Sequence, residues 1–374
     1  MLFVSGCTNK INQTGSWLVT YDSTLTPRPF SSDSVKLTTA QIQQGIPTGS
    51  GSVLALGQVP WTESDLLISF SGLDSVYDAG TIVSAQLILY RSTYNLEPNG
   101  LDVNNMQFIG FTMDSLWDPS TATADTIAQI GYGGSNVVLS QSFEDTTITI
   151  NLDTSIVRQW GLATVDTNYR NYGFILKPSN TSGVVSIYSS VNVGTGYEPY
   201  LIVACVKDGL ADTVTSNYSS TMTIGRTSIT TFAPSGPYHI VQSGTGERET
   251  LNFDLGSVPK FSIVNYAELT LYANPIDTLY SSNSTDSLIA SYIASTSPIT
   301  PNISSESFSS QTGDKYVFNV TLAVQLMLNS GNNGFLIQRL SELDNVDSRF
   351  MYDELAPDSL KPKLTIIYAP VVRR

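Results

Sequence analysis

The sequence holds few of the side chains on which most enzymes depend. It contains one histidine, His239, and two cysteines, Cys7 and Cys205, and 13% of its residues are charged, about half the usual share. So few His and Cys residues exclude a zinc site of ordinary ligand count and a scaffold dense in disulfides. No nucleophile elbow, Walker loop or dinucleotide fingerprint occurs in a suitable context. We therefore expect a protein that is not an enzyme.

Long apolar runs and positive charge are also scarce. No apolar run approaches the roughly 18 residues that a membrane-spanning helix needs. The chain has 18 basic and 32 acidic residues, which give a net charge of −14 and a pI near 4.4. A chain with so little positive charge is a poor partner for phosphate backbones. We expect no binding to nucleic acid, and contact with a membrane only through a lipid anchor.

The sequence does contain segments in which apolar side chains alternate with other side chains. Residues 85–90 (AQLILY) and 147–152 (TITINL) alternate apolar with other side chains, as half-buried antiparallel strands do. Helical pattern is confined to residues 154–160 and 322–328. Residues 281–311 are rich in Ser and are expected to form long loops with one edge strand. The chain is therefore predicted to be all-β.

Short segments recur in the same order in the two halves of the chain. Residues 85–90 (AQLILY) match residues 267–272 (AELTLY), and residues 171–176 (NYGFIL) match residues 332–337 (NNGFLI). An internal repeat indicates one domain written twice. We expect two tandem antiparallel β-sandwich domains that contact each other across a short linker near Asp208. The predicted organisation is a lipobox remnant and tether at 1–16, β-sandwich domain 1 at 17–207, β-sandwich domain 2 at 208–370 and a tail at 371–374.

The repeated segments resemble a known family. In the second copy, residues 211–214 (ADTV), 223–225 (TIG) and 253–255 (FDL) look like the opening half of a DNRLRE domain, a group related to carbohydrate-binding module family 96 and to archaeal disaggregatase. The resemblance implies β-sandwiches of jelly-roll type in extracellular proteins, some of which bind polysaccharides. The acidic residue usual before the last strand is present as Glu354 in copy two, and Val191 stands in its place in copy one.

The start of the chain suggests where the protein is located. The segment Val4-Ser5-Gly6-Cys7 resembles the bacterial lipobox, in which small residues precede a cysteine that becomes lipidated. The positive residues and the roughly 7 to 15 apolar residues of a full signal are missing, so either the true start lies upstream of Met1 or the match is accidental. We expect lipidation of Cys7 and a location on the outer face of a bacterial membrane, without a span.

Aromatic residues near turns are the candidates for sugar binding, because pyranose faces stack on flat rings. The four tryptophans all lie in the first copy. Trp117, in the turn-like segment 115–119 (SLWDP), is the first candidate. Tyr94 and Tyr132, which neighbour turn residues, come second, and Trp61 comes third. The alternative for each is a loop aromatic tucked over the end of the sandwich.

Two other residues are assigned to the core. The repeat places Trp160 opposite Met327, and a position that takes either residue fills volume rather than binds a sugar. Cys205 shares the alternating face of Leu201 and Val203, so we expect a buried, unreactive thiol.

No cofactor is expected. Acidic turns such as Asp344–Asp347 carry oxygen ligands of the kind Ca²⁺ takes, but they lack EF-hand spacing, and solvated loop acids are the favoured interpretation. The predicted function is a non-catalytic, extracellular, lipid-anchored protein that binds a polysaccharide or a cell-envelope glycan. Two alternatives stay open: a structural or adhesive surface protein without a sugar ligand, and a glycan-cleaving lyase or hydrolase.

Overall fold

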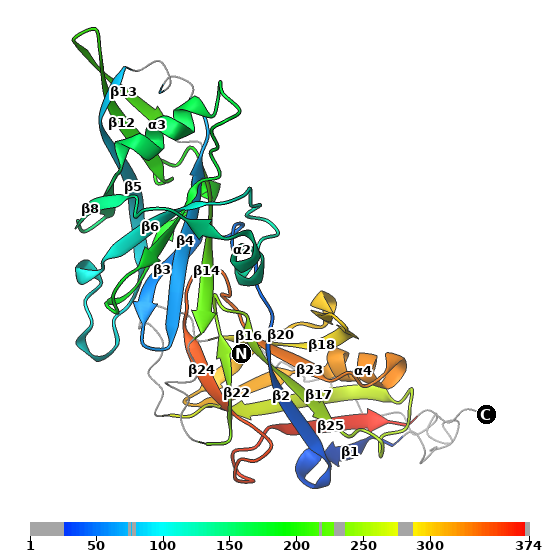
Figure 1. Cartoon of the computed structure of the whole chain (residues 1–374). Coiled ribbons are helices and arrows are strands. Elements are labelled where there is room, and N and C mark those ends of the chain that lie inside the picture. Colours follow the sequence, from blue (N-terminus) through cyan, green and yellow to red (C-terminus); the bar gives the residue numbers. More distant parts are fainter. Residues whose placement is uncertain are drawn as a thin grey trace, which may run out of the picture.

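A computed structural model of the chain describes residues 26–73, 76, 80–216, 219–227, 236–275 and 287–370. These residues form antiparallel sheets with a few short helices, which confirms the all-β prediction. Figure 1 shows two lobes joined at an angle, each built around its own sheets. We call the lobe that contains β3 to β14 the first lobe, and the other the second lobe.

The first lobe holds a sheet of 12 strands whose main path runs β13-β12-β5-β11-β3-β4-β10-β6-β7, with β14 on β4 and β9 between β5 and β8. Its elements are β3 (Val53–Val59), β4 (Thr62–Phe70), β5 (Thr81–Leu96), η4 (Pro98–Gly100), η5 (Val103–Asn105), β6 (Phe108–Met113), α2 (Ala124–Ile130), β7 (Tyr132–Gly133), β8 (Val138–Phe143), β9 (Thr147–Leu152), α3 (Thr154–Leu162), β10 (Phe174–Pro178), β11 (Gly183–Tyr188), η6 (Ser190–Asn192), β12 (Tyr200–Lys207), β13 (Leu210–Ser216) and β14 (Ser219–Thr227).

The core of the first lobe follows the predicted alternation. Leu87 and Leu89 of β5 face Leu66 of β4 and Phe174 of β10 in one buried apolar cluster. Trp160 of α3 stacks on Phe174 at 5.7 Å between ring centroids and is 3% exposed. Its assignment to the core is confirmed. Cys205, a free thiol, is buried in the same cluster, and burial is the main reason that its pKa is raised, so the thiol is unreactive as expected.

The second lobe is a sandwich of two sheets, ordered β1-β25-β17-β22-β21 and β19-β18-β23-β16-β15-β24, with β2 on β16 and β20 on β18. Its elements are β1 (Arg28–Ser31), η3 (Ser32–Ser34), β2 (Leu37–Gln43), β15 (Tyr238–Gln242), β16 (Glu247–Phe253), β17 (Ile263–Tyr272), β18 (Leu288–Thr296), β19 (Ile299–Pro301), η8 (Ile303–Ser305), β20 (Ser307–Phe308), β21 (Ser310–Thr312), β22 (Lys315–Asn319), α4 (Thr321–Ser330), β23 (Phe335–Arg339), β24 (Ser348–Tyr352) and β25 (Lys363–Ala369).

The Ser-rich region before residue 311 is more regular than expected. Strand β18 is nine residues long and pairs with β23 on one side and with β19 and β20 on the other. Its first six residues are buried. The expectation of long loops with one edge strand was wrong here, because burial in the sheet outweighs the weak strand preference of a Ser-rich segment.

Strand pairing does not follow the expected boundary at residue 207. Asp208 and Gly209 form the tight turn of the hairpin β12–β13 and do not link the lobes. Strand β14 continues in the first lobe and pairs with β4 over nine residues. At the other end of the chain, β1 pairs with β25 and β2 pairs with β16, so both belong to the second lobe. The first lobe is therefore one continuous segment set between two parts of the second.

One local feature occurs in both lobes. Gly173 before β10 and Gly334 before β23 have φ angles of 78° and 88°, which favour glycine. A Cβ atom would lie 2.3 Å from the carbonyl oxygen of Ile68 at Gly173, and 2.4 Å from that of Leu251 at Gly334. Both positions exclude any larger residue for the same reason. The wider relation of the lobes as a repeat stays a prediction.

A buried joint holds the two lobes together, as the expected contact between them requires. Its apolar part contains residues from both lobes: Ala55, Val59, Trp61, Tyr94, Leu96 and Val184 from the first, and Ile240, Val346 and Phe350 from the second. Tyr94 also donates a 2.7 Å hydrogen bond to Asp347. Gln242 of β15 donates to the hydroxyl of Thr62 of β4. A joint that is both apolar and hydrogen-bonded fixes the angle between the lobes.

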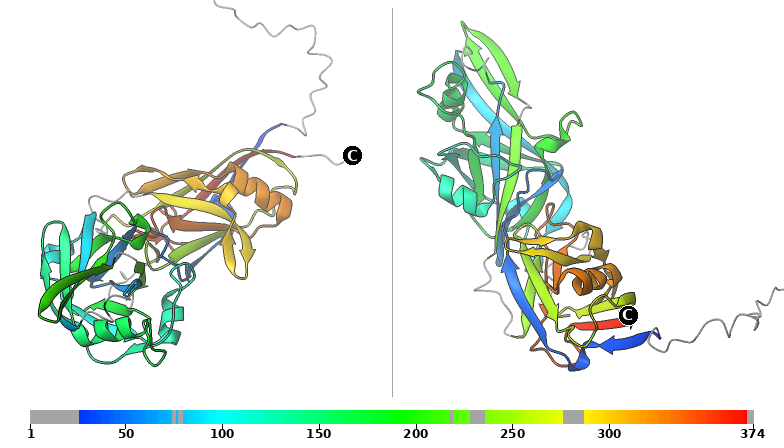
Figure 2. Two further views of the ribbon diagram at one scale, coloured as in Figure 1. Left: turned by 90° about the horizontal axis from the view of Figure 1, so that it is seen from above. Right: turned by 90° about the vertical axis from the view of Figure 1, so that its right-hand side faces the viewer.

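Both ends of the described chain leave from the second lobe. Arg28 at the start of β1 lies opposite Tyr368 near the end of β25. Figure 2 shows the two ends close together at the end of the second lobe that lies away from the first lobe. The first lobe is thus the distal part of the molecule relative to its termini.

Candidate functional site

Four tyrosine rings meet on the outer face of the first lobe. Tyr90, Tyr188 and Tyr200 come from the neighbouring strands β5, β11 and β12. Tyr197, from the loop before β12, stacks on Tyr188 with 5.1 Å between ring centroids and meets Tyr90 edge-on at 5.6 Å. The centroids of Tyr90 and Tyr200 are 6.1 Å apart. We call these four residues the tyrosine cluster.

The outward direction of these rings follows from the period of two. Leu89 of β5 and Leu201 of β12 point into the core, so the adjacent Tyr90 and Tyr200 point away from it. Tyr197 is the most open of the four residues, with an exposure of 51%. The other three rings are partly buried. The cluster therefore offers flat ring surface to solvent on a scaffold of three paired strands.

The loop that carries Tyr197 is fixed by hydrogen bonds to its own backbone. The hydroxyl of Ser189 accepts from the amide of Val191 at the start of η6. Further along, the buried carboxylate of Glu198 accepts from the amides of Gly194 and Gly196 at 3.3 and 2.9 Å. Hydrogen bonds from backbone amides, its own first, lower the pKa of Glu198 and keep it ionised. This loop presents Tyr197 in one position.

Two amide side chains lie farther along the same sheet, on β5 and on its neighbour β9. On the outer side of β5, Gln86 and Ile88 precede Tyr90, with about 7 Å between successive side chains on one face. Gln86 Nε2 donates to Asn151 Oδ1 at 3.0 Å, and Asn151 Nδ2 donates to Ser140 Oγ at 2.8 Å. Rings that accept C–H groups and amides that pair with hydroxyls form the combination that a sugar polymer needs.

The structure places Trp117 and Tyr132 in one partly buried apolar cluster on another surface of the first lobe, together with Tyr172. Trp117 uses its indole N–H internally, because Nε1 donates to the backbone oxygen of Tyr172 at 2.8 Å. Its ring is half-buried. Trp117 packs over the sheet rather than standing free at a turn, which is the alternative that the sequence left open.

Tyr132 belongs to a small charged and aromatic surface. Its ring lies 5.8 Å from that of Phe111, and the ammonium group of Lys177 lies 5.8 Å from the Tyr132 centroid. Lys177 also forms ion pairs with Glu63 at 2.8 Å and with Asp65 at 2.7 Å. The charged groups of this surface thus bind one another, which leaves fewer of them for a ligand.

Trp61 and Tyr94 are not available to a ligand. They are 3% and 8% exposed, and both lie in the joint between the lobes. Their neighbouring turn residues suggested exposed loop rings, but the second lobe covers both side chains. The prediction that they stack on a sugar is therefore corrected. Cys7, the predicted lipidation site, lies outside the described residues.

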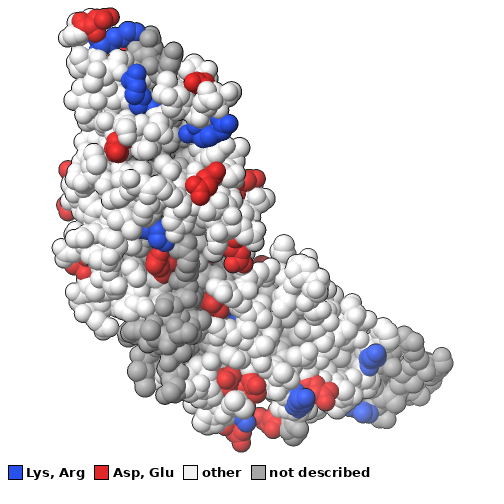
Figure 3. Space-filling view, in the orientation of Figure 1, with Lys and Arg blue, Asp and Glu red and all other residues white. Residues whose placement is uncertain are grey.

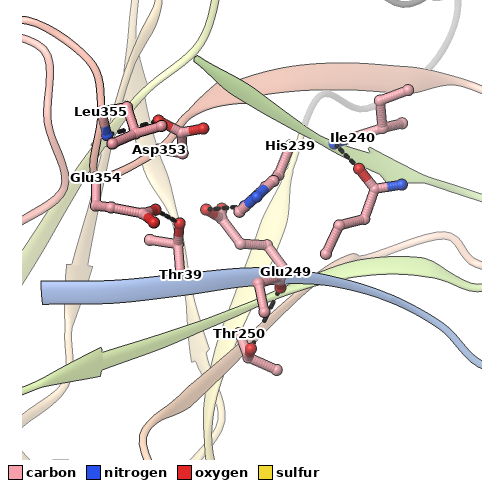
Figure 4. A network of polar contacts seen from close by, with 10 residues as sticks. Thr39, His239, Ile240, Glu249, Thr250, Asp353, Glu354 and Leu355 are labelled. Atoms are coloured by element: carbon pink, nitrogen blue, oxygen red, sulfur yellow. Dashed lines mark hydrogen bonds and ion pairs between the residues drawn. The ribbon is translucent and has the colours of Figure 1, made fainter.

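A buried acid and the single histidine form a polar cluster in the second lobe (Figure 4). His239 Nδ1 and Glu249 Oε1 are 3.2 Å apart. Burial raises the pKa of Glu249 to about 7, and the nearby carboxylates of Asp353 and Glu354 act in the same direction against His239. Burial alone would lower the pKa of His239, but the contact with Glu249 raises it overall. Thr39 of β2 donates a hydrogen bond to Glu354.

The part of the chain that the structure describes contains neither a metal-ligand cluster nor a membrane-spanning helix. In the described ranges, no three His, Cys, Asp or Glu side chains converge in a way that could hold a metal ion. None of the helices in those ranges combines the length and apolar character needed to cross a bilayer.

The chain has no match among known protein families, curated proteins or solved structures. The likeness to DNRLRE domains rests on the short motifs alone and stays a prediction.

Sequence reasoning missed the tyrosine cluster, although part of its signal was present. The alternation that buries Leu87 and Leu89 also directs Tyr90 outward, and the same holds for Tyr200 beside Leu201. The sequence analysis instead ranked Trp117, in a turn-like segment, as the first candidate for sugar binding. No sequence pattern predicted that the loop before β12 folds back and stacks Tyr197 on Tyr188.

Proposed function

We propose that this chain is a non-catalytic, extracellular polysaccharide-binding protein that grips a glycan on the tyrosine cluster of the first lobe. The observation that carries the proposal is the stack of Tyr188 and Tyr197 beside Tyr90 and Tyr200 on an outer sheet face. Strands hold three of the rings, so little ordering is needed on binding. Low ordering cost favours affinity in a shallow site.

The charge of the chain points to the chemical class of the ligand. A net charge of −14 repels an anionic polymer at long range. Gln86, four residues before Tyr90 on β5, and Asn151 of the neighbouring β9 are neutral amides on the same sheet. A neutral polysaccharide with exposed C–H faces fits both features, so we assign that class.

Anchorage is part of the same proposal. A lipid on Cys7 would hold the end of the second lobe at which β1 begins, and the tyrosine cluster would then lie in the lobe farther from the membrane. The buried joint would keep it at that distance. A surface protein that captures a polymer benefits from such a reach.

Affinity electrophoresis against a panel of neutral and acidic polysaccharides tests the binding site. We expect retardation by at least one neutral glycan, and loss of that retardation in Tyr197→Ala. Tyr169→Ala is the matched control, because Tyr169 is an exposed tyrosine of the first lobe outside the cluster. Retardation that survives Tyr197→Ala but not Trp117→Ala would move the site to the surface of Trp117 and Tyr132. Release of reducing ends or unsaturated products would contradict the non-catalytic part.

A structural or adhesive role is the second candidate. It is favoured by the joint, because two lobes fixed at one angle make a stiff spacer whether or not a ligand binds. Migration that no glycan changes, in the parent and in every variant, would leave this candidate in place of the first.

A further inference from the structure

An uncharged sheet face continues from the tyrosine cluster toward the hairpin β12–β13. It is the outer side of five neighbouring strands, β8, β9, β5, β12 and β13. Leu87, Ile150 and Val203 of these strands point into the core, so the residues next to them point outward. The outward residues in the described strand pairs carry no charge and are Ser84, Gln86, Ile88, Tyr90, Ser140, Ser142, Thr147, Thr149, Asn151, Tyr200, Ile202, Ala204, Thr213 and Thr215.

The lack of charge belongs to this side of the sheet. Asp212 of β13 is paired with Cys205, whose thiol lies in the core, so the Asp212 side chain lies on the opposite side. On the side of the first lobe drawn in Figure 3, charged side chains of both signs are scattered over the surface. A ligand on the uncharged face meets hydroxyl, amide and apolar groups instead. This composition suits a neutral sugar polymer and offers no counter-charge to an anionic one.

One row of paired residues crosses all five strands. Ile202 of β12 lies between Thr215 of β13 and Gln86 of β5. Asn151 of β9 lies between Gln86 and Ser140 of β8. Neighbouring strands are about 4.8 Å apart, and paired residues point to the same face. We call these five residues the cross-strand row.

Two hydrogen bonds hold the amides of the cross-strand row in place. Gln86 Nε2 donates to Asn151 Oδ1 at 3.0 Å, and Asn151 Nδ2 donates to Ser140 Oγ at 2.8 Å. A primary amide has two N–H groups and an oxygen with two lone pairs. Within the described part of the chain, the oxygen of Gln86 and a second N–H on each amide are thus left for sugar hydroxyls. Because the amides are already oriented, little ordering is needed when a ligand binds.

The cross-strand row and the tyrosine cluster are too far apart to contact one sugar ring. Gln86 lies four residues before Tyr90 on β5, which is about 13 Å along the strand. Ile88 and Tyr200 are paired with each other between these two levels of the sheet. A ligand that reaches both places must therefore be an extended run of several sugar residues.

We propose that the tyrosine cluster and the cross-strand row are the two ends of one binding track, which takes several consecutive residues of a neutral β-1,4-linked hexose polymer. The inference rests on the proposed polysaccharide binding and names the class of ligand. Polymers with this linkage are extended ribbons whose faces carry C–H groups and whose edges carry hydroxyls. A track along one strand is nearly straight and matches such a ribbon. Polymers with an α-1,4 linkage coil and would leave the sheet between the two ends.

Isothermal titration calorimetry of the full chain with cellobiose, cellotetraose and cellohexaose tests the track. We expect the affinity to rise about tenfold or more from cellobiose to cellohexaose, because only the longer ligand reaches the cross-strand row. The double variant Gln86→Ala with Asn151→Ala should bind cellohexaose about tenfold more weakly than the parent does. It should bind cellobiose as the parent does, which also shows that it is folded. Gln86→Ala alone, a smaller change, should weaken cellohexaose binding about threefold.

The matched control removes an amide outside the uncharged face. Gln129 is exposed on α2, which packs beside Trp117, and Gln129→Ala should leave both affinities unchanged. Maltohexaose has an α-1,4 linkage and the same number of sugar residues as cellohexaose, and it should bind no better than cellobiose. Equal affinities for cellobiose and cellohexaose overturn the track. Equal binding of maltohexaose and cellohexaose, or a double variant that binds cellohexaose like the parent, also overturns it.

Failure of the track and failure of the proposed function give different results. If Tyr197→Ala abolishes cellobiose binding but the double variant keeps full affinity for cellohexaose, the tyrosine cluster binds sugar and the track is wrong. If a neutral glycan of another linkage retards the chain in electrophoresis and cellohexaose does not bind, polysaccharide binding stands and the β-1,4 class is wrong. If no glycan binds, both proposals are wrong. Dimers that Ile202→Lys converts to monomers, with no oligosaccharide bound, would assign the face to a second copy of the chain.

Discussion

The hydroxyl of Tyr94 in the first lobe donates a 2.7 Å hydrogen bond to Oδ1 of Asp347 in the second lobe, and both side chains are buried. Burial, and then the charge of Asp347, raise the pKa of Tyr94 well above its usual value, so the phenol keeps its proton and donates at every ordinary pH. The carboxylate of Asp347 also lies 3.8 Å from the guanidinium of Arg339. This contact links the two lobes through residues that the sequence separates widely.

Removing the Tyr94 hydroxyl should weaken the joint. Tyr94→Phe leaves the ring in place but takes away a donor to a buried carboxylate, which should lower the free energy of unfolding by about 1–3 kcal/mol. Urea unfolding followed by fluorescence measures the change. Tyr169→Phe, at an exposed tyrosine, is the control and should change stability by less than about 0.5 kcal/mol. Equal stability of Tyr94→Phe and the parent would contradict a structural role for this contact.

The strand pairing predicts where the chain can be divided. A fragment of residues 44–227 keeps every strand of the first lobe, and we expect it to be soluble and to unfold cooperatively. A fragment of residues 17–207 lacks β13 and β14, and one of residues 208–370 lacks β1 and β2. Each loses strands that cover sheet edges, so both should aggregate. Circular dichroism melting and gel filtration of the three fragments provide the test. Independent folding of the fragments cut at residue 207 would show that these strand pairings are dispensable.

Stability should depend on pH through the cluster of Glu249 and His239. The folded pKa of Glu249 is raised from 4.5 to about 7, so the folded state holds its proton more tightly than the unfolded state does. The resulting stabilisation is full below about pH 4.5 and is lost as the pH rises through about 7. The raised pKa of His239 acts in the same direction. The loss in unfolding free energy is on the order of 3 kcal/mol.

Glu249→Gln tests this dependence. The amide cannot ionise, so the stability of this variant should change less between pH 5 and pH 8 and should gain on the parent at the higher pH. Exposed Glu144→Gln is the control and should follow the parent. Chemical unfolding at four or five pH values measures all three proteins. If the unfolding free energies of the parent and of Glu249→Gln changed with pH in parallel, the cluster of Glu249 and His239 would not be the cause of the pH dependence.

Trp160 offers a test of its assignment to the core. Trp160→Ala removes a buried ring that stacks on Phe174 and should cost about 3–5 kcal/mol. Trp160→Met, which places at this position the residue found at Met327, keeps more of the volume and should cost clearly less. Thermal unfolding of the two variants gives the comparison. A Met variant as unstable as the Ala variant would argue against the predicted equivalence of the two positions.

Some of the fold was predictable from local pattern. Alternation in residues 85–90 and 147–152 predicted strands that now lie in β5 and β9, and the helical pattern at residues 154–160 and 322–328 lies in α3 and α4. These predictions succeeded because a period of two or of 3.6 directly reflects which side chains face a core. The prediction of loops for the Ser-rich segment failed at β18, because the burial of this strand comes from the sheet around it.

The candidate site was less predictable than the fold. Trp61 and Tyr94 have the local features of exposed loop residues, yet the second lobe buries them. Exposure depends on what folds back over a residue, and such contacts join residues far apart in sequence. Tyr197 was missed for the same reason. Its ring joins the tyrosine cluster only because its loop folds back onto Tyr188.

By itself, the sequence determined the class of fold, the acidic surface and the scarcity of catalytic side chains, because composition and short-range periodicity fix these. Only the tertiary structure decided which strands complete which lobe, which aromatic rings stay exposed and which acid is buried beside His239. Strand pairing across hundreds of residues depends on edges that exist only once the sheets have formed, and no local pattern encodes that choice.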